Sequence, residues 1–231
     1  MHYPGATPRA NQPMPLRPSQ SSLPDVEYAR IGIIGCGRLG SAIARLAVGA
    51  GMVAVVSNKG GRSTLQDFAR ELGDLAVAAS VTEAAQEEIV VLAVPWSQLA
   101  VALLEVPDWD GRIVIDATNP DMPTAALPDF LARNSSEIVS HLVPGARLVK
   151  AFNTLPPQLL LMSPEAATGR RVIFFSGDHA RAKAVIGRMI AHLGLAGIDL
   201  GRLSEGGRLQ QFPSGALVGL NLISIGPSTV F

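Results

Sequence analysis

A glycine-rich segment carries the clearest chemical signal in the chain. Gly35, Gly37 and Gly40 have the spacing G-x-G-x-x-G, follow the apolar run 30–34 and open into an alanine-rich stretch. After a strand, the first glycine permits a tight turn, the second lets the backbone approach a pyrophosphate, and the third lets a helix pack on the strand. We therefore expect a dinucleotide here, with its phosphates at the N-terminus of the helix, where free N–H groups and the helix dipole favour an anion. A purely structural glycine turn is the alternative.

The segment that follows the second predicted strand favours one type of dinucleotide. NAD-binding proteins place an Asp or Glu about 20 residues beyond the glycines to bind the ribose 2′-hydroxyl. This sequence has Ser57, Asn58 and Lys59 instead, followed by Arg62 and Ser63. Hydroxyl, amide and cationic groups suit a 2′-phosphate, because a phosphate accepts many charge-assisted hydrogen bonds. The sequence therefore favours NADP(H), unless these residues form a solvated basic turn that binds nothing.

Three further strand ends are informative, because open α/β sheets bind ligands beyond the carboxyl ends of their strands. The fourth predicted strand leads to Pro95 and Trp96, the fifth to Asn119 and the sixth to Asn153. We expect the two asparagines to flank a nicotinamide, although turn or helix-capping roles are open for both. Trp96 is more typical of a core residue than of a stacking platform.

Cysteine and histidine set limits on other chemistry. Cys36 is the only cysteine, which excludes an intramolecular disulfide and fits a reducing cytoplasm. At a helix N-terminus the dipole tends to lower the pKa of a thiol, so we expect Cys36 to be reactive until a bound pyrophosphate covers it. The four histidines lack the paired spacing of metal ligands, and no metal site is expected.

Composition excludes two classes of partner. The formal net charge is zero and the sequence contains no block of Lys or Arg, so nucleic acid is not expected. The apolar runs are far shorter than the roughly 20 residues that cross a bilayer. Residues 1–27 are rich in proline and polar residues, which predicts a disordered tail and not a signal peptide.

The remaining pattern predicts an α/β fold, Rossmann-like and doubly wound, with a mostly parallel sheet of about eight strands. It indicates a nucleotide-binding domain over 28–211 and an apolar C-terminal extension over 212–231, whose segment 216–225 could serve a homodimer or a partner. The strands are expected at 30–34, 52–57, 75–79, 89–93, 112–116, 146–151, 171–176 and 198–200. The helices are expected at 39–50, 64–72, 96–104, 136–142 and 179–193.

Several of these segments together resemble a known family. The runs IGIIGCGRLGSAIA, VLAVPW, IVIDATNP, GARLVKAFNT, SGDHARAKAVI and LSEGGRLQ are similar, in this order over about residues 30–211, to the F420-dependent NADP oxidoreductases. The resemblance implies a Rossmann domain that transfers a hydride between NADPH and a deazaflavin, the coenzyme F420, with the two rings stacked over the strand ends. After Gln211 the sequence departs from the family pattern.

The resemblance also implies roles for individual residues, with no side chain acting as an acid or base. The pyrophosphate would lie on Gly35, Cys36, Gly37, Arg38, Leu39 and Gly40, and the 2′-phosphate on Ser57, Asn58 and Lys59. The nicotinamide would be lined by Ala93, Val94, Pro95, Asn119 and Ala151, and the acceptor bordered by Asn119, Pro120, Phe152 and Asn153.

Other functions share the same fingerprint. Pyrroline-carboxylate reductases add a long helical domain, for which too few residues follow the last predicted strand. A flavin or ferric reductase and a non-catalytic NADP(H) sensor are the alternatives that stay open.

We predict that the chain binds NADPH at least about tenfold more tightly than NADH, which corresponds to about 1.4 kcal/mol. The reason is that donors and a cation stand where NAD-binding proteins have a carboxylate. Lys59→Ala should reduce the ratio, measured from dissociation constants by fluorescence titration. Equal constants for the two dinucleotides in the unaltered protein would contradict the prediction.

Overall fold

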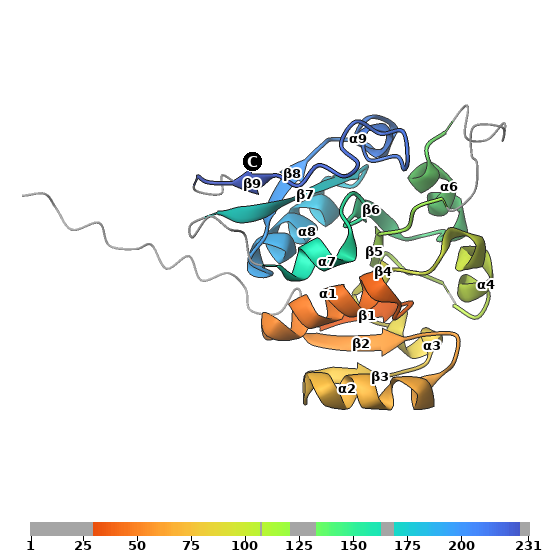
Figure 1. Ribbon diagram of the computed structural model, residues 1–231. Helices are drawn as coiled ribbons and strands as arrows, with labels where there is room; N and C mark the ends of the chain where they lie inside the picture. The colour runs from red at the N-terminus through yellow and green to blue at the C-terminus, as the bar shows by residue number, and fades with distance from the viewer. Residues whose placement is uncertain (1–29, 107, 121–132, 163–168, 227–231) are drawn as a thin grey trace, which may run out of the picture.

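The computed structural model describes residues 30–106, 108–120, 133–162 and 169–226, so the predicted tail over 1–27 and residues 227–231 of the extension lie outside the description. Within it one sheet organises the chain (Figure 1). Its order is β3-β2-β1-β4-β5-β6-β7-β8, with β9 paired to β7. The strands are β1 (Arg30–Ile34), β2 (Val53–Ser57), β3 (Ala76–Ala78), β4 (Ile89–Leu92), β5 (Ile113–Asp116), β6 (Arg147–Ala151), β7 (Arg170–Gly177), β8 (Ala196–Asp199) and β9 (Ile223–Ser224).

Strand direction confirms the predicted doubly wound, mostly parallel sheet. All neighbours from β3 to β6 pair in parallel. Strand β7 is antiparallel to β6, while β8 is parallel to β7. The chain moves outward in one direction from β1 to β2 and β3, and then crosses to the other side of β1 to form β4. Sheets of this type bind their ligands beyond the carboxyl ends of the strands at such a reversal, which here are the ends of β1 and β4.

Helices cover both faces of the sheet, because the strands bury side chains on both sides. On one face α1 (Arg38–Gly49), α7 (Pro157–Leu161) and α8 (Ala180–His192) pack with Ile31 and Ile33. On the other, α3 (Val81–Ala84), α4 (Leu99–Leu103), α6 (Ser135–Leu142) and α9 (Leu203–Leu209) pack with Ile34 and Leu92. The described chain also contains the helices η1 (Arg62–Leu65), α2 (Gln66–Leu72) and η2 (Trp96–Gln98).

The predicted strands and helices are all present, but four elements were missed. The missed elements are α3, α7, α9 and β9, which are too short to show a hydrophobic period or, in α9, contain a Gly-Gly pair that disfavours a helix. The predicted helices over 64–72 and 96–104 each begin with a 3₁₀ turn, η1 and η2. Tertiary packing stabilises these short elements, because an isolated helix of this length is marginal in water.

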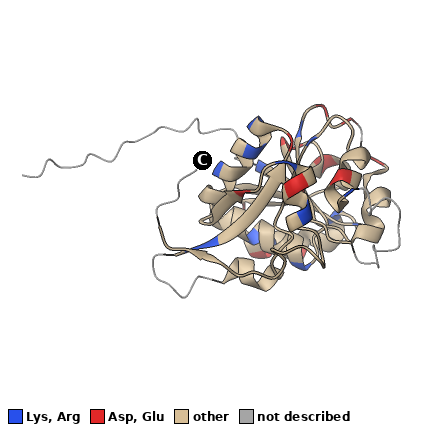
Figure 2. Ribbon diagram, turned by 90° about the horizontal axis from the view of Figure 1, so that it is seen from above, with Lys and Arg blue, Asp and Glu red and all other residues tan. Residues whose placement is uncertain are grey.

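The charges are scattered over the described chain, with no continuous block of either sign in the view from above (Figure 2). Among the described residues, no helix combines the length and the apolar character that a bilayer crossing requires. The same part of the chain holds no group of three or more His, Cys, Asp or Glu residues placed to bind a metal.

Candidate functional site

The turn between β1 and α1 has the geometry expected of a phosphate-binding loop. Gly35 has φ 101°, and its N–H donates to the carbonyl oxygen of Ser57 at 2.9 Å. A Cβ atom at Gly35 would lie 2.6 Å from the carbonyl oxygen of Ala93, and one at Gly40 would lie 1.9 Å from that of Gly35. Both positions therefore exclude any side chain, so the turn closes tightly against β2 and the end of β4.

The space in front of this turn fits a pyrophosphate. Gly37 is exposed, and a Cβ atom there would meet nothing within 4 Å. Gly37 is also the N-cap of α1, with no side-chain hydrogen bond to the cap and no acidic residue in the first turn. The first N–H groups of a 12-residue helix thus face an open surface without a carboxylate to compete. Arg38 is exposed beside them, and Leu39 is half-buried.

Cys36 does not have the acidity that its position suggested. The thiol is half-buried, and this burial raises its pKa above the ordinary value. A hydrogen bond with the Ser41 hydroxyl, at 3.5 Å, and the Arg45 charge oppose the effect without reversing it. The expected lowering of the pKa is therefore wrong: loss of water around the thiolate outweighs the Ser41 hydrogen bond and the Arg45 charge.

The polar side chains of the loop after β2 differ in their burial and in their hydrogen bonds. The Ser57 side chain is fully buried, and its hydroxyl donates to the carbonyl oxygen of Ile33 at 2.9 Å. Asn58 uses Oδ1 to accept from the N–H of Gly60 at 2.9 Å. Lys59 is exposed at the tip of the loop. Ser57 thus supports the turn, the half-buried Asn58 braces the loop through Oδ1, and Lys59 is the exposed residue of this trio.

Arg62, on the same loop, is held by a carboxylate from α3. Its guanidinium bonds Glu83 Oε1 at 2.5 Å, and both side chains are about half exposed. The Arg62 hydrogen bond is the largest cause that lowers the pKa of Glu83 to about 2, followed by the hydrogen bond from the main chain of Ser80. Glu83 therefore stays ionised at neutral pH and competes with any phosphate for Arg62.

The ends of β5 and β6 bring two predicted residues together. Asn119 Nδ2 donates to the carbonyl oxygen of Asn153 at 2.8 Å, and Asn153 Nδ2 donates to Asn119 Oδ1 at 2.9 Å. The Asn153 amide also donates to the carbonyl oxygen of Gln210 at 2.8 Å. Gln210, which is fully buried, was not predicted, and its single position at the end of α9 gave no periodic signal.

The neighbouring predicted residues lie at the same edge with different exposure. Ala93 and Val94 are half-buried and Pro95 is exposed, while Pro120 and Ala151 are buried. Phe152 has φ 64°, and its ring is only 1% exposed, within the core cluster of α1 and α8. Only the main chain of Phe152 therefore lies at the carboxyl edge of the sheet.

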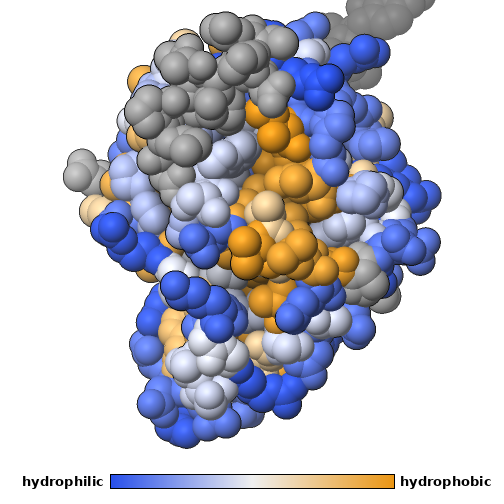
Figure 3. Space-filling view, turned by 90° about the vertical axis from the view of Figure 1, so that its right-hand side faces the viewer, coloured by the Kyte–Doolittle hydropathy of each residue, from blue (hydrophilic) through white to orange (hydrophobic). Residues whose placement is uncertain are grey.

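Seen from this side, the carboxyl edge of the sheet carries an apolar band flanked by hydrophilic surface (Figure 3). The half-buried Leu39 and Val94 are among the apolar residues of the turns at this edge. A surface of this kind excludes water from a flat apolar ring.

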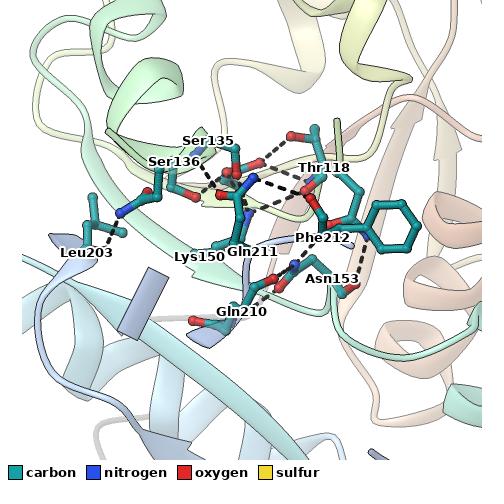
Figure 4. A network of polar contacts seen from close by, with 12 residues as sticks. Thr118, Ser135, Ser136, Lys150, Asn153, Leu203, Gln210, Gln211 and Phe212 are labelled. Atoms are coloured by element: carbon teal, nitrogen blue, oxygen red, sulfur yellow. Dashed lines mark hydrogen bonds and ion pairs between the residues drawn. The ribbon is translucent and has the colours of Figure 1, made fainter. Parts of the chain in front are cut away.

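A buried ion pair lies beneath Asn119. Lys150 Nζ is 3.2 Å from Asp116 Oδ2, and both side chains are 0% exposed. Lys150 also donates to the carbonyl oxygen of Thr118 at 3.3 Å and to Ser135 Oγ at 3.4 Å, and Asp116 accepts from the Ser136 hydroxyl (Figure 4). This pair was not predicted, although a Lys and an Asp inside otherwise apolar strands indicate a buried ion pair.

With this geometry established, the chain can be compared with known proteins. The family model for coenzyme F420-dependent NADP oxidoreductases matches residues 30–120, which include the phosphate turn and Asn119. A hypothetical protein from Sinorhizobium meliloti is 42% identical, with a TM-score of 0.76, over 83% of this chain and 94% of that one. The family model thus matches the chain from β1 to the residues that follow β5, and the similarity to the Sinorhizobium protein extends over most of its length.

More distant structures agree on the fold. A candidate F420-dependent NADP reductase from Arthrobacter sp. FB24 is 22% identical, with a TM-score of 0.63, and the match covers 84% of this chain and 99% of that one. A reductive aminase from Aspergillus terreus in complex with NADPH and ethyl levulinate is 22% identical, with a TM-score of 0.54, over 76% of this chain and 56% of that one. These two structures share the Rossmann-like fold of this chain.

Releasing Arg62 should strengthen the binding of NADPH. Glu83→Gln removes the charge of the competitor but keeps a side chain that suits the N3 position of the α3 capping box. Because an exposed ion pair contributes little, we expect NADPH to bind up to about fivefold more tightly, with no change for NADH. Asp67→Asn, which breaks the exposed Asp67–Arg70 pair on α2, is the matched control. Weaker NADPH binding by the Glu83 variant would mean that the ion pair orders the loop instead.

Breaking the buried pair should destabilise the whole protein. Lys150→Met leaves a buried carboxylate without its cation, which costs about 3–5 kcal/mol of unfolding free energy, measured by urea denaturation. Lys183→Met removes the partly exposed Lys183–Asp199 pair and should cost about 1 kcal/mol or less. The double variant Lys150→Met with Asp116→Asn should recover part of the loss. Equal effects of the two lysine substitutions would contradict this account.

Proposed function

We propose that this oxidoreductase transfers a hydride between NADPH and a deazaflavin of the coenzyme F420 type. The observation that carries the proposal is the convergence, at one edge of the sheet, of the open phosphate turn, the Asn119–Asn153 amide pair and an apolar surface. The family match over residues 30–120 supports the choice of acceptor.

The proposal gives each predicted residue a role. The turn at Gly35 and Gly37 binds the pyrophosphate through main-chain N–H groups, and Asn58 and Lys59 bind the 2′-phosphate. Ser57 contributes by fixing the turn, since its own hydroxyl is engaged with Ile33. The rings lie over the apolar edge, between the β4 end and the Asn119–Asn153 pair. The residues proposed to contact the cofactor are Gly35, Cys36, Gly37, Arg38, Leu39, Gly40, Asn58, Lys59, Ala93, Val94, Pro95, Asn119 and Ala151.

This edge of the sheet suits a reaction that depends mainly on how two rings are positioned. Bound NADPH supplies the hydride, and transfer between two stacked rings requires alignment and a dry site more than a side-chain acid or base. Asp116 and Lys150, the titratable residues of β5 and β6 nearest to Asn119, are fully buried and paired with each other. They cannot exchange protons with a substrate in this arrangement. The paired amides of Asn119 and Asn153 instead hold fixed positions beside the place where the rings meet.

An anaerobic mixture of the protein, NADPH and oxidised deazaflavin should lose the deazaflavin absorbance at a catalytic rate. Asn119→Ala should lower kcat about tenfold or more, because small displacements of either ring slow the transfer steeply, while NADPH affinity changes little. Lys59→Ala should do the reverse, weakening NADPH binding at an unchanged kcat. These opposite responses separate ring placement from phosphate binding.

Free flavin and a ferric chelate are run beside the deazaflavin. If either is reduced at a catalytic rate while the deazaflavin is untouched, the acceptor assignment is wrong. If NADPH binds and no acceptor of the three is reduced, the chain acts as a sensor, and the enzymatic proposal fails.

A further inference from the structure

The segment that follows α9 forms a closed loop over the end of β6. At its start, the carbonyl oxygen of Gln210 accepts from Asn153 Nδ2 at 2.8 Å. At its far end, the N–H of Gly219 donates to the carbonyl oxygen of Thr154 at 2.8 Å. Residues 211–218 therefore leave the sheet beside Asn153 and return to it one residue further along. Both ends of the loop therefore lie next to Asn153, one of the residues proposed to border the acceptor.

Hydrogen bonds fix the base of this loop. Gln210 is fully buried, and its amide contacts Asn153 Oδ1, Ser176 Oγ and the carbonyl oxygen of Phe174. Gln211 Oε1 accepts from the N–H of Ser135, the first residue of α6, at 2.8 Å. The main chain at the start of the loop is thus held from β6, β7 and α6 together, and the next residue has a defined position.

That next residue is Phe212, which is 39% exposed. Gln211 Nε2 donates to its carbonyl oxygen at 3.3 Å, and in Figure 4 the ring projects from the network on the side opposite Ser135 and Ser136. Phe212 thus presents part of an aromatic side chain to solvent from a backbone that is held on both sides. Phe152, the aromatic residue that the sequence placed at this edge, is buried in the core and does not present its ring there.

We propose that Phe212 is the aromatic wall of the acceptor site and determines its specificity for flat polycyclic acceptors. This inference rests on the proposed function, which it deepens by naming the residue that meets the acceptor ring. Aromatic rings attract one another in offset-stacked or edge-to-face arrangements beyond the area that they bury. Phe212 acts on the acceptor alone, because the phosphate turn and the Lys59 loop belong to the opposite part of the sheet edge, after β1 and β2.

The test is a fluorescence titration of oxidised deazaflavin into protein saturated with NADP⁺, repeated with flavin mononucleotide. Phe212→Ala should raise the dissociation constant of the ring about two- to tenfold, the equivalent of one lost aromatic pair. Phe212→Tyr should restore it, and Phe212→Leu, which keeps the apolar bulk without the ring, should not. The dissociation constant of NADPH should stay the same in all three variants.

Leu222→Ala is the matched control, since Leu222 is a similarly exposed apolar residue of the same C-terminal segment, at 42%, and its hydrogen bond to Val172 comes from the main chain. Unchanged affinity for both rings in Phe212→Ala, or an equal loss for NADPH, overturns the inference. If the unaltered protein binds flavin and not deazaflavin, the proposed acceptor is wrong, while a Phe212 effect on flavin binding still supports the wall. If neither ring binds, both proposals fail.

Discussion

The ion pair between Lys150 and Asp116 is the contact on which the acceptor half of the site depends. It joins neighbouring strands β5 and β6 at their carboxyl ends, and neither side chain is exposed. A buried charge is tolerated only where its partners are complete, so the main chain around the pair can move little without a large loss of free energy. Because Lys150 also binds the Thr118 carbonyl oxygen, this constraint extends to the residue that precedes Asn119.

The two halves of the site are positioned by different kinds of force. The phosphate half is set by steric exclusion: Gly35 and Gly40 leave no room for a side chain, so helix, strand and turn approach as closely as backbone atoms allow. The acceptor half is set by hydrogen bonds among polar side chains from β5, β6, α6 and the end of α9. The first arrangement suits a ligand recognised through main-chain N–H groups. The second fixes the amides of Asn119 and Asn153 and the main chain that leads to Phe212.

Burial decides the chemistry of individual groups at this edge. Cys36 has a raised pKa because its half-buried thiolate loses water, although it stands at a helix N-terminus. Ser57 cannot offer its hydroxyl proton to a ligand because the side chain is fully enclosed and bonded to Ile33. Phe152 adopts a positive φ, which is uncommon for a bulky residue, while its ring joins the core. In each case the residue type suggested contact with a ligand, whereas the packing buries the side chain partly or fully.

The sequence by itself determined the fold class, the place of the glycine fingerprint between a strand and a helix, and the family resemblance. These follow from local signals: glycines at fixed spacing, apolar runs of strand length and one amphipathic helix between them. The pairing of Asn119 with Asn153 was also foreseeable, because parallel strands end at the same edge of a sheet.

Only the tertiary structure decided which polar residues meet across long separations in the chain. Gln210 reaches Asn153, and Lys150 reaches Asp116, through contacts that no local pattern encodes. The same holds for Phe212, which lies in a short loop without periodicity and gains its place from bonds at residues 153 and 154. Local propensity acts over a few residues, whereas these contacts are selected by the packing of the whole sheet.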